Sequence, residues 1–340
     1  MGKGSNFMIS EHRQCEEWAQ KYPEFFRIST LKEVKTENGY EPLIMFELHA
    51  PGGNKDVPVL GLFAGVHGIE AIGVKILMNF LDHLLAQVSW NHSIQNLLRK
   101  VRIVGIPIVN PYGFVQGTRC NGQGVDLMRN APIESSESIL FFGGQKMSPT
   151  LPYFRGFGRL EKENEALLDV IQRHLLSAPF SLSLDLHSGF GLTDFLWTPY
   201  AKQSGLPPTW ESYKRIHQLL DNTLRQHVYT FQPQSMNYCT SGDIWDFVYE
   251  QSLQAGKKGH FLPLTLEVGS WAWVRKSPGT ALKLRSFFNP AHPHRERRVL
   301  RRHLALLNLL AHICANSQQV FEGLLSPPSY VQPFEAKTGT

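Results

Sequence analysis

The stretch that decides the fold is Val59-Leu-Gly-Leu-Phe-Ala-Gly-Val-His67-Gly-Ile-Glu70, in which an apolar run stops at a glycine-flanked histidine and a glutamate follows. The apolar run predicts a buried strand. Residues 71–85 place their apolar side chains near helical spacing, which predicts a helix. We therefore expect His67 and Glu70 at the carboxyl end of a strand, where open α/β sheets bind ligands.

A histidine and a carboxylate at this corner are donors that one divalent ion accepts, and zinc binds N and O ligands at about 2.0–2.2 Å. His187, in Ser183-Leu-Asp-Leu-His-Ser-Gly, is the candidate third ligand because it also ends an apolar run. Two histidines and one carboxylate would leave one tetrahedral position for water, the composition of a hydrolytic zinc site. A surface turn at 67–70 and a hydrogen-bonded core histidine at 187 are the alternatives that the residues alone leave open.

Apolar runs that alternate with helical patterns predict an α/β sheet covered on both faces. The glycine-containing turn at 51–54 predicts a hairpin between the segments that flank it. No segment has the composition of a linker, so we expect one domain over residues 1–340, with an irregular tail at 326–340. The strands are expected near 25–28, 43–48, 59–66, 101–109, 180–186 and 261–268, and the helices at 10–21, 71–85, 161–176, 208–227, 243–253 and 295–315.

Composition bounds the partners and the compartment. The chain of 340 residues is 42% apolar with a formal charge of +5, and its densest basic run, 295–302, interleaves with leucines as the solvated face of an amphipathic helix does. We therefore expect no nucleic-acid partner. No apolar run is long enough to predict a membrane span. Scattered cysteines and an N-terminus without a signal-peptide pattern predict reduced thiols and a cytoplasmic location; the cysteines are Cys15, Cys120, Cys239 and Cys314.

The glycine-rich segment 110–130 lies between the two histidines and carries Arg119, Asp126 and Arg129. Guanidinium groups suit a bidentate grip on a carboxylate or on a developing oxyanion. An aspartate is suited to orient a ligating imidazole through its second ring nitrogen. Composition alone favours a surface loop with solvated charges.

Four blocks in order resemble the M14 zinc carboxypeptidase family: His67-Gly-Ile-Glu70, Gly124-Val-Asp-Leu-Met-Arg-Asn, Asp185-Leu-His187-Ser and Leu264-Thr-Leu-Glu267. A looser fifth block is Tyr238-Cys-Thr-Ser-Gly-Asp-Ile-Trp-Asp. The segment 110–130 looks most like the short bacterial members, near the murein-peptide amidase branch. The resemblance implies an α/β fold with a mixed, mostly parallel central sheet of about eight strands and helices on both faces.

The resemblance also implies a catalytic apparatus. His67, Glu70 and His187 would bind one Zn²⁺ per chain. Glu267 would take a proton from the attacking water and then protonate the leaving amine. The remaining implied roles are oxyanion stabilisation by Arg119, a grip on the substrate carboxylate by Arg129, closure over the substrate by Tyr238 and a hydrogen bond from His67 to Asp126.

Three departures or open points concern the substrate. The family's usual asparagine before the carboxylate-binding arginine is Met128 here, which removes a hydrogen-bond donor from that grip. Asp243, Trp245 and Asp246 are candidates for reading the substrate side chain, although Asp243 is favoured as a helix N-cap. Two tryptophans in the segment 270–288 predict either a wall of the pocket or an apolar surface plug.

The resulting hypothesis is a metallopeptidase that hydrolyses the amide of a C-terminal residue or small peptide. The alternative within enzymes is an acyl-amino-acid amidohydrolase of the succinylglutamate desuccinylase and aspartoacylase type, which shares the histidine–glutamate block. Either substrate carries a free carboxylate. A catalytically inactive binding module on the same fold is the third hypothesis. The oligomeric state is not predicted.

Overall fold

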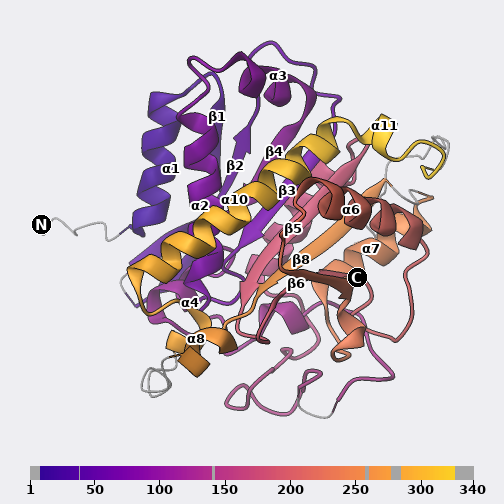
Figure 1. Cartoon of the computed structure of the whole chain (residues 1–340). Coiled ribbons are helices and arrows are strands. Elements are labelled where there is room, and N and C mark those ends of the chain that lie inside the picture. Colours follow the sequence, from indigo (N-terminus) through magenta and orange to yellow (C-terminus); the bar gives the residue numbers. More distant parts are fainter. Residues whose placement is uncertain (1–7, 38, 140–141, 257–259, 277–284, 326–340) are drawn as a thin grey trace, which may run out of the picture.

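An eight-stranded sheet forms the centre of the structure, a computed structural model that describes residues 8–37, 39–139, 142–256, 260–276 and 285–325. The strand order is β1-β2-β4-β3-β5-β8-β6-β7, with four parallel and three antiparallel pairings (Figure 1). The mixed, mostly parallel sheet confirms the expected architecture. The strands are β1 (Phe26–Thr36), β2 (Gly39–Leu48), β3 (Val59–Ala64), β4 (Arg102–Ile106), β5 (Ser181–Ser188), β6 (Asp194–Thr198), β7 (Tyr229–Pro233) and β8 (Phe261–Val268).

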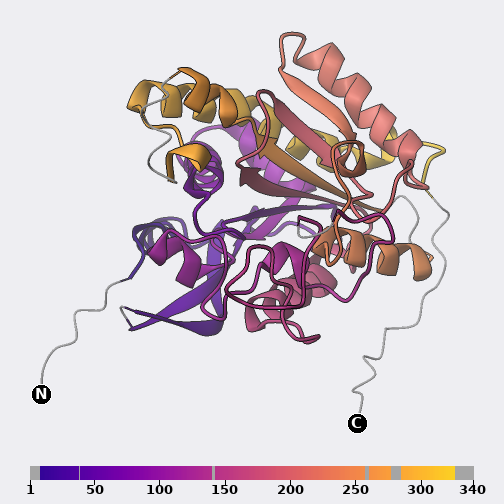
Figure 2. The ribbon, with the colours of Figure 1, turned by 90° about the horizontal axis from the view of Figure 1, so that it is seen from below.

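Helices cover both faces of the sheet, as the view from below makes plain (Figure 2). Two long helices, α2 and α10, contact each other and strands β3 and β5 on one face, whereas α5 and α7 contribute to the core on the other. The helices are α1 (Ser10–Lys21), α2 (Ala71–Leu85), α3 (His92–Lys100), α4 (Pro111–Gln116), α5 (Lys162–Val170), α6 (Trp210–Thr223), α7 (Ile244–Gln254), α8 (Trp271–Lys276), α9 (Arg285–Phe288), α10 (Pro293–Ala315) and α11 (Ser317–Val320), with short turns η1 (Leu127–Arg129), η2 (Ile171–Leu175) and η3 (Gln234–Met236).

The three central strands β3, β5 and β8 divide their side chains between two apolar clusters. In β5, Leu182, Leu184 and Leu186 belong to the cluster beneath α2 and α10. Because successive strand residues point to opposite faces, Asp185 and His187 face the other side. β8 follows the same pattern, since Leu266 joins the first cluster and Glu267 points away from it. The apolar alternation therefore fixes which face carries the polar residues.

Helix α2 lies unusually close to strand β5 because Gly73 faces it. A Cβ atom at Gly73 would lie 2.3 Å from the carbonyl oxygen of Leu186, well inside van der Waals contact. This close approach brings the start of α2, and with it Glu70, next to the end of β5. The local sequence thus positions the expected metal corner against His187.

Two details differ from the sequence-based expectations. The turn at 51–54 does not close a hairpin, because β4 lies between β2 and β3; the hairpin is instead β1–β2. Strands β6 and β7 were not predicted from the residue pattern, because both are only five residues long. The expected irregular tail at 326–340 lies outside the described residues.

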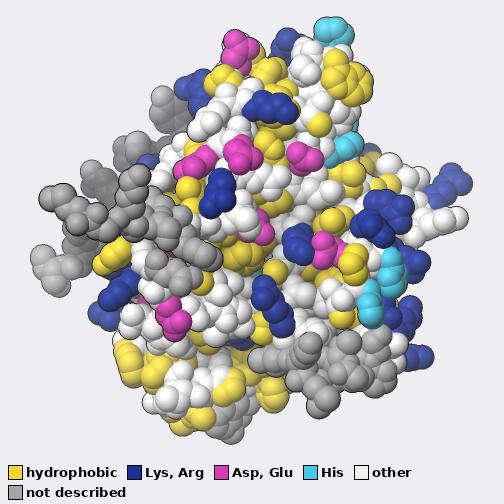
Figure 3. All heavy atoms as spheres, turned by 90° about the vertical axis from the view of Figure 1, so that its left-hand side faces the viewer, with side chains coloured by type: hydrophobic (Ala, Val, Ile, Leu, Met, Phe, Trp, Pro, Cys, Tyr) yellow, Lys and Arg dark blue, Asp and Glu magenta, His cyan; other side chains and the backbone are white. Residues whose placement is uncertain are grey.

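The surface mixes charges of both signs. On the face in Figure 3, Lys and Arg side chains lie among Asp, Glu and apolar side chains. Among the described helices, none combines the length and hydropathy that crossing a bilayer requires.

Candidate metal centre and catalytic pocket

The carboxyl ends of β3, β5 and β8 bring together the residues that the sequence singled out. His187 on β5 lies directly opposite Glu267 on β8 in the parallel register. β3 pairs with β5 on its other side, and the turn that follows β3 carries His67 and Glu70. All four residues are at most 7% exposed, and they line one cavity.

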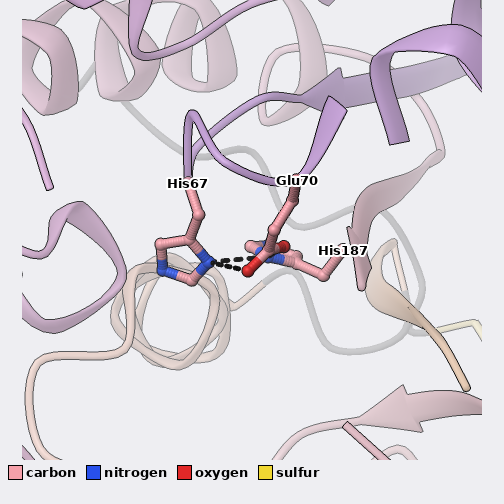
Figure 4. Close-up of side chains that lie close together, drawn as sticks. All are labelled: His67, Glu70 and His187. Atoms are coloured by element: carbon pink, nitrogen blue, oxygen red, sulfur yellow. Dashed lines mark hydrogen bonds and ion pairs between the residues drawn. The ribbon is translucent and has the colours of Figure 1, made fainter. Parts of the chain in front are cut away.

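His67, Glu70 and His187 form a tight cluster (Figure 4). The Glu70 carboxylate lies between the rings, with Oε1 at 2.8 Å from His67 Nδ1 and Oε2 at 3.0 Å from His187 Nδ1. The two Nδ1 atoms are 3.2 Å apart. Donor atoms of all three residues lie within 4.8 Å of one another.

The second nitrogen of each histidine faces a buried aspartate. His67 Nε2 lies 3.0 Å from Asp126 Oδ1, and His187 Nε2 lies 2.9 Å from Asp185 Oδ2. When Nε2 donates its proton to the aspartate, Nδ1 is left as a lone-pair donor toward the cluster centre. Asp126 was predicted for this role, whereas Asp185 was not, although its position two residues before His187 on a strand puts both side chains on one face.

The donor set fits a zinc ion. Two nitrogens held at about 2.0–2.1 Å from zinc at a tetrahedral angle lie about 3.3 Å apart. The observed separation of 3.2 Å between the Nδ1 atoms agrees with that value. Both nitrogens also face a carboxylate, so the cluster offers the N₂O composition of a hydrolytic zinc site.

Electrostatics keep the Glu70 carboxylate ionised, which is the form that binds a cation. Burial alone would raise the pKa of Glu70, but His67 and His187 outweigh it and hold that pKa well below its usual value. Burial would likewise lower the pKa of His187, but Asp185 and Glu70 raise it well above 6.5. Protonation of His187 therefore competes with metal binding, because a ligating histidine must be neutral.

Glu267 stands beside the cluster but outside it. Its Oε1 accepts a hydrogen bond from the backbone N–H of Phe190 at 2.9 Å. Burial, reinforced by the charge of Glu70, raises the pKa of Glu267 to about 8. A carboxyl group tuned toward neutral pH is suited to accept and return a proton.

A cavity of about 450 Å³ opens over this cluster. Arg119 and Arg129 both line it. The Nε of Arg119 donates to Asp126 Oδ2 at 2.8 Å. The Nη1 of Arg119 lies 3.5 Å from Glu70 Oε1. The Nε of Arg129 is buried and lacks a hydrogen-bond partner. The cavity wall thus contains one anchored guanidinium and one with unused hydrogen-bonding capacity.

Tyr238 and Met128 complete this side of the cavity. Burial raises the pKa of Tyr238 to about 12, so its hydroxyl stays protonated at neutral pH. Met128 places an apolar side chain next to Arg129, and its backbone N–H donates to Asp126. Met128 therefore adds an apolar surface to the cavity beside Arg129.

The three candidates for reading the substrate side chain fare differently. Asp243 lines the cavity and also caps helix α7, because its Oδ1 accepts from the backbone N–H groups of Trp245 and Asp246. Asp246 turns toward the backbone of residues 201 and 202. Trp245 is not among the described residues that line this cavity, because its indole N–H donates to Asp185 at 2.8 Å, behind His187. Its expected part in reading the substrate stays a prediction.

A cluster of aromatic side chains that includes Tyr238 lines part of the cavity. Phe190 is at its centre, with ring centroids 5.5 Å from Tyr238 and 5.3 Å from Trp271. Of the two tryptophans predicted as a wall or a plug, Trp271 lines the cavity, whereas Trp273 packs against the apolar core. Part of that segment, 277–284, lies outside the described residues.

Comparison with known proteins agrees with this geometry. The family model described as zinc carboxypeptidase matches residues 12–270. Carboxypeptidase Z of Rattus norvegicus is 29% identical over 166 residues, which cover 43% of this chain but only 25% of that protein. The chain thus spans about a quarter of the length of this curated relative.

Solved structures share the fold at low sequence identity. The crystal structure of thrombin activatable fibrinolysis inhibitor has a TM-score of 0.69 at 17% identity. The superposition covers 89% of this chain and 73% of the inhibitor chain. Carboxypeptidase A from Helicoverpa armigera has a TM-score of 0.65 at 17% identity and covers 90% of this chain and 72% of its own. These likenesses establish the architecture and not the activity.

Proposed function

Because this chain belongs to the zinc carboxypeptidase family, we propose that it is a zinc-dependent hydrolase that cleaves the amide bond of a C-terminal residue or a small peptide. The observation that carries the proposal is the convergence of two histidine Nδ1 atoms and one carboxylate beside a separate buried glutamate. This arrangement provides a metal site and a proton acceptor in one cavity. We further propose that one domain with one zinc per chain performs the reaction.

His67, Glu70 and His187 would hold the ion. When bound, zinc would supply Lewis acidity that activates a water molecule and polarises the scissile carbonyl. Asp126 and Asp185 would keep the two imidazoles oriented, with Nδ1 of each directed at the cluster centre. Because these charges are buried and paired, removing one partner would cost more stability than breaking a surface ion pair does.

Glu267 would act as the proton shuttle. Its carboxylate would accept a proton from the attacking water and then donate it to the leaving nitrogen. The backbone N–H of Phe190 fixes the carboxylate at 2.9 Å while leaving its second oxygen for this work. Its place opposite His187 in the register supports the assignment.

The two arginines would divide the anionic groups of the substrate. Arg119, anchored by Asp126, would donate to the carbonyl oxygen as negative charge develops there. Arg129, with an unpartnered buried Nε, would bind the terminal carboxylate. Tyr238 would donate its protonated hydroxyl to the bound substrate, and Met128 would shield the carboxylate side from water.

The substrate carries a free carboxylate in this proposal. Asp243 lines the cavity with one oxygen committed to capping α7, so its second oxygen supports a weaker role in binding a cationic group. The comparisons do not favour the acyl-amino-acid hydrolase alternative. The placement near the murein-peptide amidase branch stays a prediction, as does the cytoplasmic location, which free thiols at all four cysteines support.

A paired-substrate assay tests the proposal. Zinc-loaded protein would be given blocked dipeptides with a free C-terminal carboxylate, the same dipeptides as C-terminal amides, and N-acetyl and N-succinyl amino acids. We expect hydrolysis of the free-carboxylate dipeptides, at least tenfold slower cleavage of the amides, and loss of activity on chelation. Preferential hydrolysis of the acyl amino acids would support the alternative enzyme, and inert zinc-loaded protein would support the binding module.

A further inference from the structure

Glu70 is the N-cap residue of helix α2, yet its side chain makes no capping hydrogen bond. The carboxylate instead contacts both histidines and accepts from the backbone N–H of Ser188 at 3.0 Å. The first N–H groups of a helix have no partner within the helix and require one from elsewhere. A residue committed to the metal cluster cannot also cap its own helix.

Asn289 supplies the missing cap from a distant part of the chain. Its Oδ1 accepts from the backbone N–H of Ile72 at 2.9 Å, the second residue of α2 and a position that an N-cap side chain normally serves. Its Nδ2 donates to the carbonyl oxygen of Ile69 at 2.7 Å. The amide of Asn289 therefore bonds the backbone on both sides of Glu70.

The segment around Asn289 also reaches the second histidine. The hydroxyl of Ser188, next to His187, donates to the carbonyl oxygen of Phe288 at 2.7 Å. The ring of Phe288 lies against Gly189, where a Cβ atom would be only 2.6 Å away. Neighbouring residues of one segment thus contact the turn of Glu70 and the strand end of His187.

We propose that Asn289 is a positioning residue for the metal cluster: by capping α2 in place of Glu70, it frees the Glu70 carboxylate to face the two histidines. This inference rests on the proposed zinc site. The amide fixes the backbone at Ile69 and Ile72, so the carboxylate between them keeps the position that joins the two Nδ1 atoms. Losing a helix cap generally lowers the stability of the protein. Losing this cap would also lower its affinity for the metal.

The test compares Asn289→Ala with Asn91→Ala. Asn91 is a matched control because it is also half-buried, caps α3 by accepting from Ser93 N–H at 3.0 Å, and donates its amide to a neighbour, Gln87. Zinc affinity would be measured by chelator competition, and thermal stability would be measured on the metal-free proteins. We expect both variants to lose similar stability, and only Asn289→Ala to bind zinc about tenfold more weakly.

Asn289→Asp keeps the acceptor for Ile72 and loses the donor to Ile69, so we expect a zinc affinity between those of the wild type and the alanine variant. Equal zinc affinity of Asn289→Ala and the wild type would overturn the inference. Should the alanine variant not fold, an aspartate variant that binds zinc as tightly as the wild type would overturn it instead. Failure of the wild type itself to bind zinc would refute the proposed function and the positioning role with it, whereas lower stability of metal-free Asn289→Ala would still show that Asn289 caps α2.

Discussion

The two buried histidines of the metal cluster and the buried His303 differ in the charged groups that surround them. His67 and His187 in the metal cluster are each 4% exposed, and each has carboxylates at hydrogen-bond distance from both ring nitrogens. His303 on α10 is fully buried, and its Nδ1 lies 2.9 Å from the hydroxyl of Tyr229. Its Nε2 has no hydrogen-bond partner.

The difference lies in the partner that the nearest carboxylate binds. Asp194 lies 3.7 Å from His303 Nε2, but its Oδ2 is occupied by Arg302 at 2.6 Å. Burial therefore dominates at His303 and lowers its pKa to about 4, whereas Asp185 and Glu70 overcome burial at His187 and raise its pKa. Of these three histidines, His67 and His187 have carboxylates at both ring nitrogens and Nδ1 atoms that face each other at 3.2 Å, an arrangement that suits a shared cation.

The largest expected effect separates the two groups by metal content. His187→Ala should lose bound zinc and about 10⁴-fold in turnover, because the ion supplies several kcal/mol of transition-state stabilisation. His303→Gln should keep full zinc, because that residue lies outside the cluster. Elemental analysis and turnover of both variants would check this, and equal zinc in the two would break the comparison.

The second effect separates proton transfer from metal binding. Glu267→Gln removes the proton acceptor while preserving the shape of the side chain, so we expect about a 10³-fold lower kcat with unchanged zinc stoichiometry. Turnover of a blocked dipeptide by zinc-loaded protein is the measurement. Residual activity above a tenth of the wild-type value would contradict the role of Glu267.

A smaller effect concerns the carboxylate behind His187. Asp185→Asn should weaken zinc binding about 10- to 100-fold, because the amide no longer holds the imidazole with Nδ1 free for the metal. Trp245→Phe serves as its graded partner, since it removes only the indole N–H that donates to Asp185. We expect a less than tenfold weakening there. If Trp245→Phe bound zinc more weakly than Asp185→Asn, the proposed order of importance would be reversed.

The smallest expected effect is on the free energy of unfolding at acidic pH, and it tests whether His303 is neutral in the folded protein. The pKa of His303 is about 4 in the folded protein and 6.5 in the unfolded chain. The unfolded state therefore binds the proton first, and stability falls as the pH drops from about 6.5 to about 4. At pH 5.5 the loss is about 1.4 kcal/mol relative to pH 8. Denaturant unfolding of the metal-free wild type and of His303→Gln would check that the wild type loses this much more than the variant.

The fold and the metal cluster were predictable because each key residue follows an apolar run. His67, His187 and Glu267 all lie at strand ends, and strand ends in a parallel sheet meet at one edge. Asp185 escaped notice, although a period of two along β5 puts it on the face of His187. The pairing of β2 with β4 was also missed, because a local turn gives no information on which strand inserts between its neighbours.

Other features depend on contacts that sequence spacing does not encode. Asn289 meets Ile72 across 217 positions of the chain, so no local pattern announces its cap. Trp245 was a candidate for reading the substrate because it belongs to the sequence block that begins at Tyr238, but a helix turns successive side chains by about a quarter of a circle or more. Its indole faces Asp185 instead, a partner that the pocket prediction did not consider.

The absent side chain at Gly73 sets the dimensions of the active centre. Because there is no room for a methyl group between Gly73 and the Leu186 carbonyl oxygen, any larger residue would push the start of α2, and with it Glu70, away from His187. A single added carbon there would act as a wedge between two of the three metal donors. Gly73 thus sets the spacing between two of the three proposed metal ligands from a position outside the ligand set.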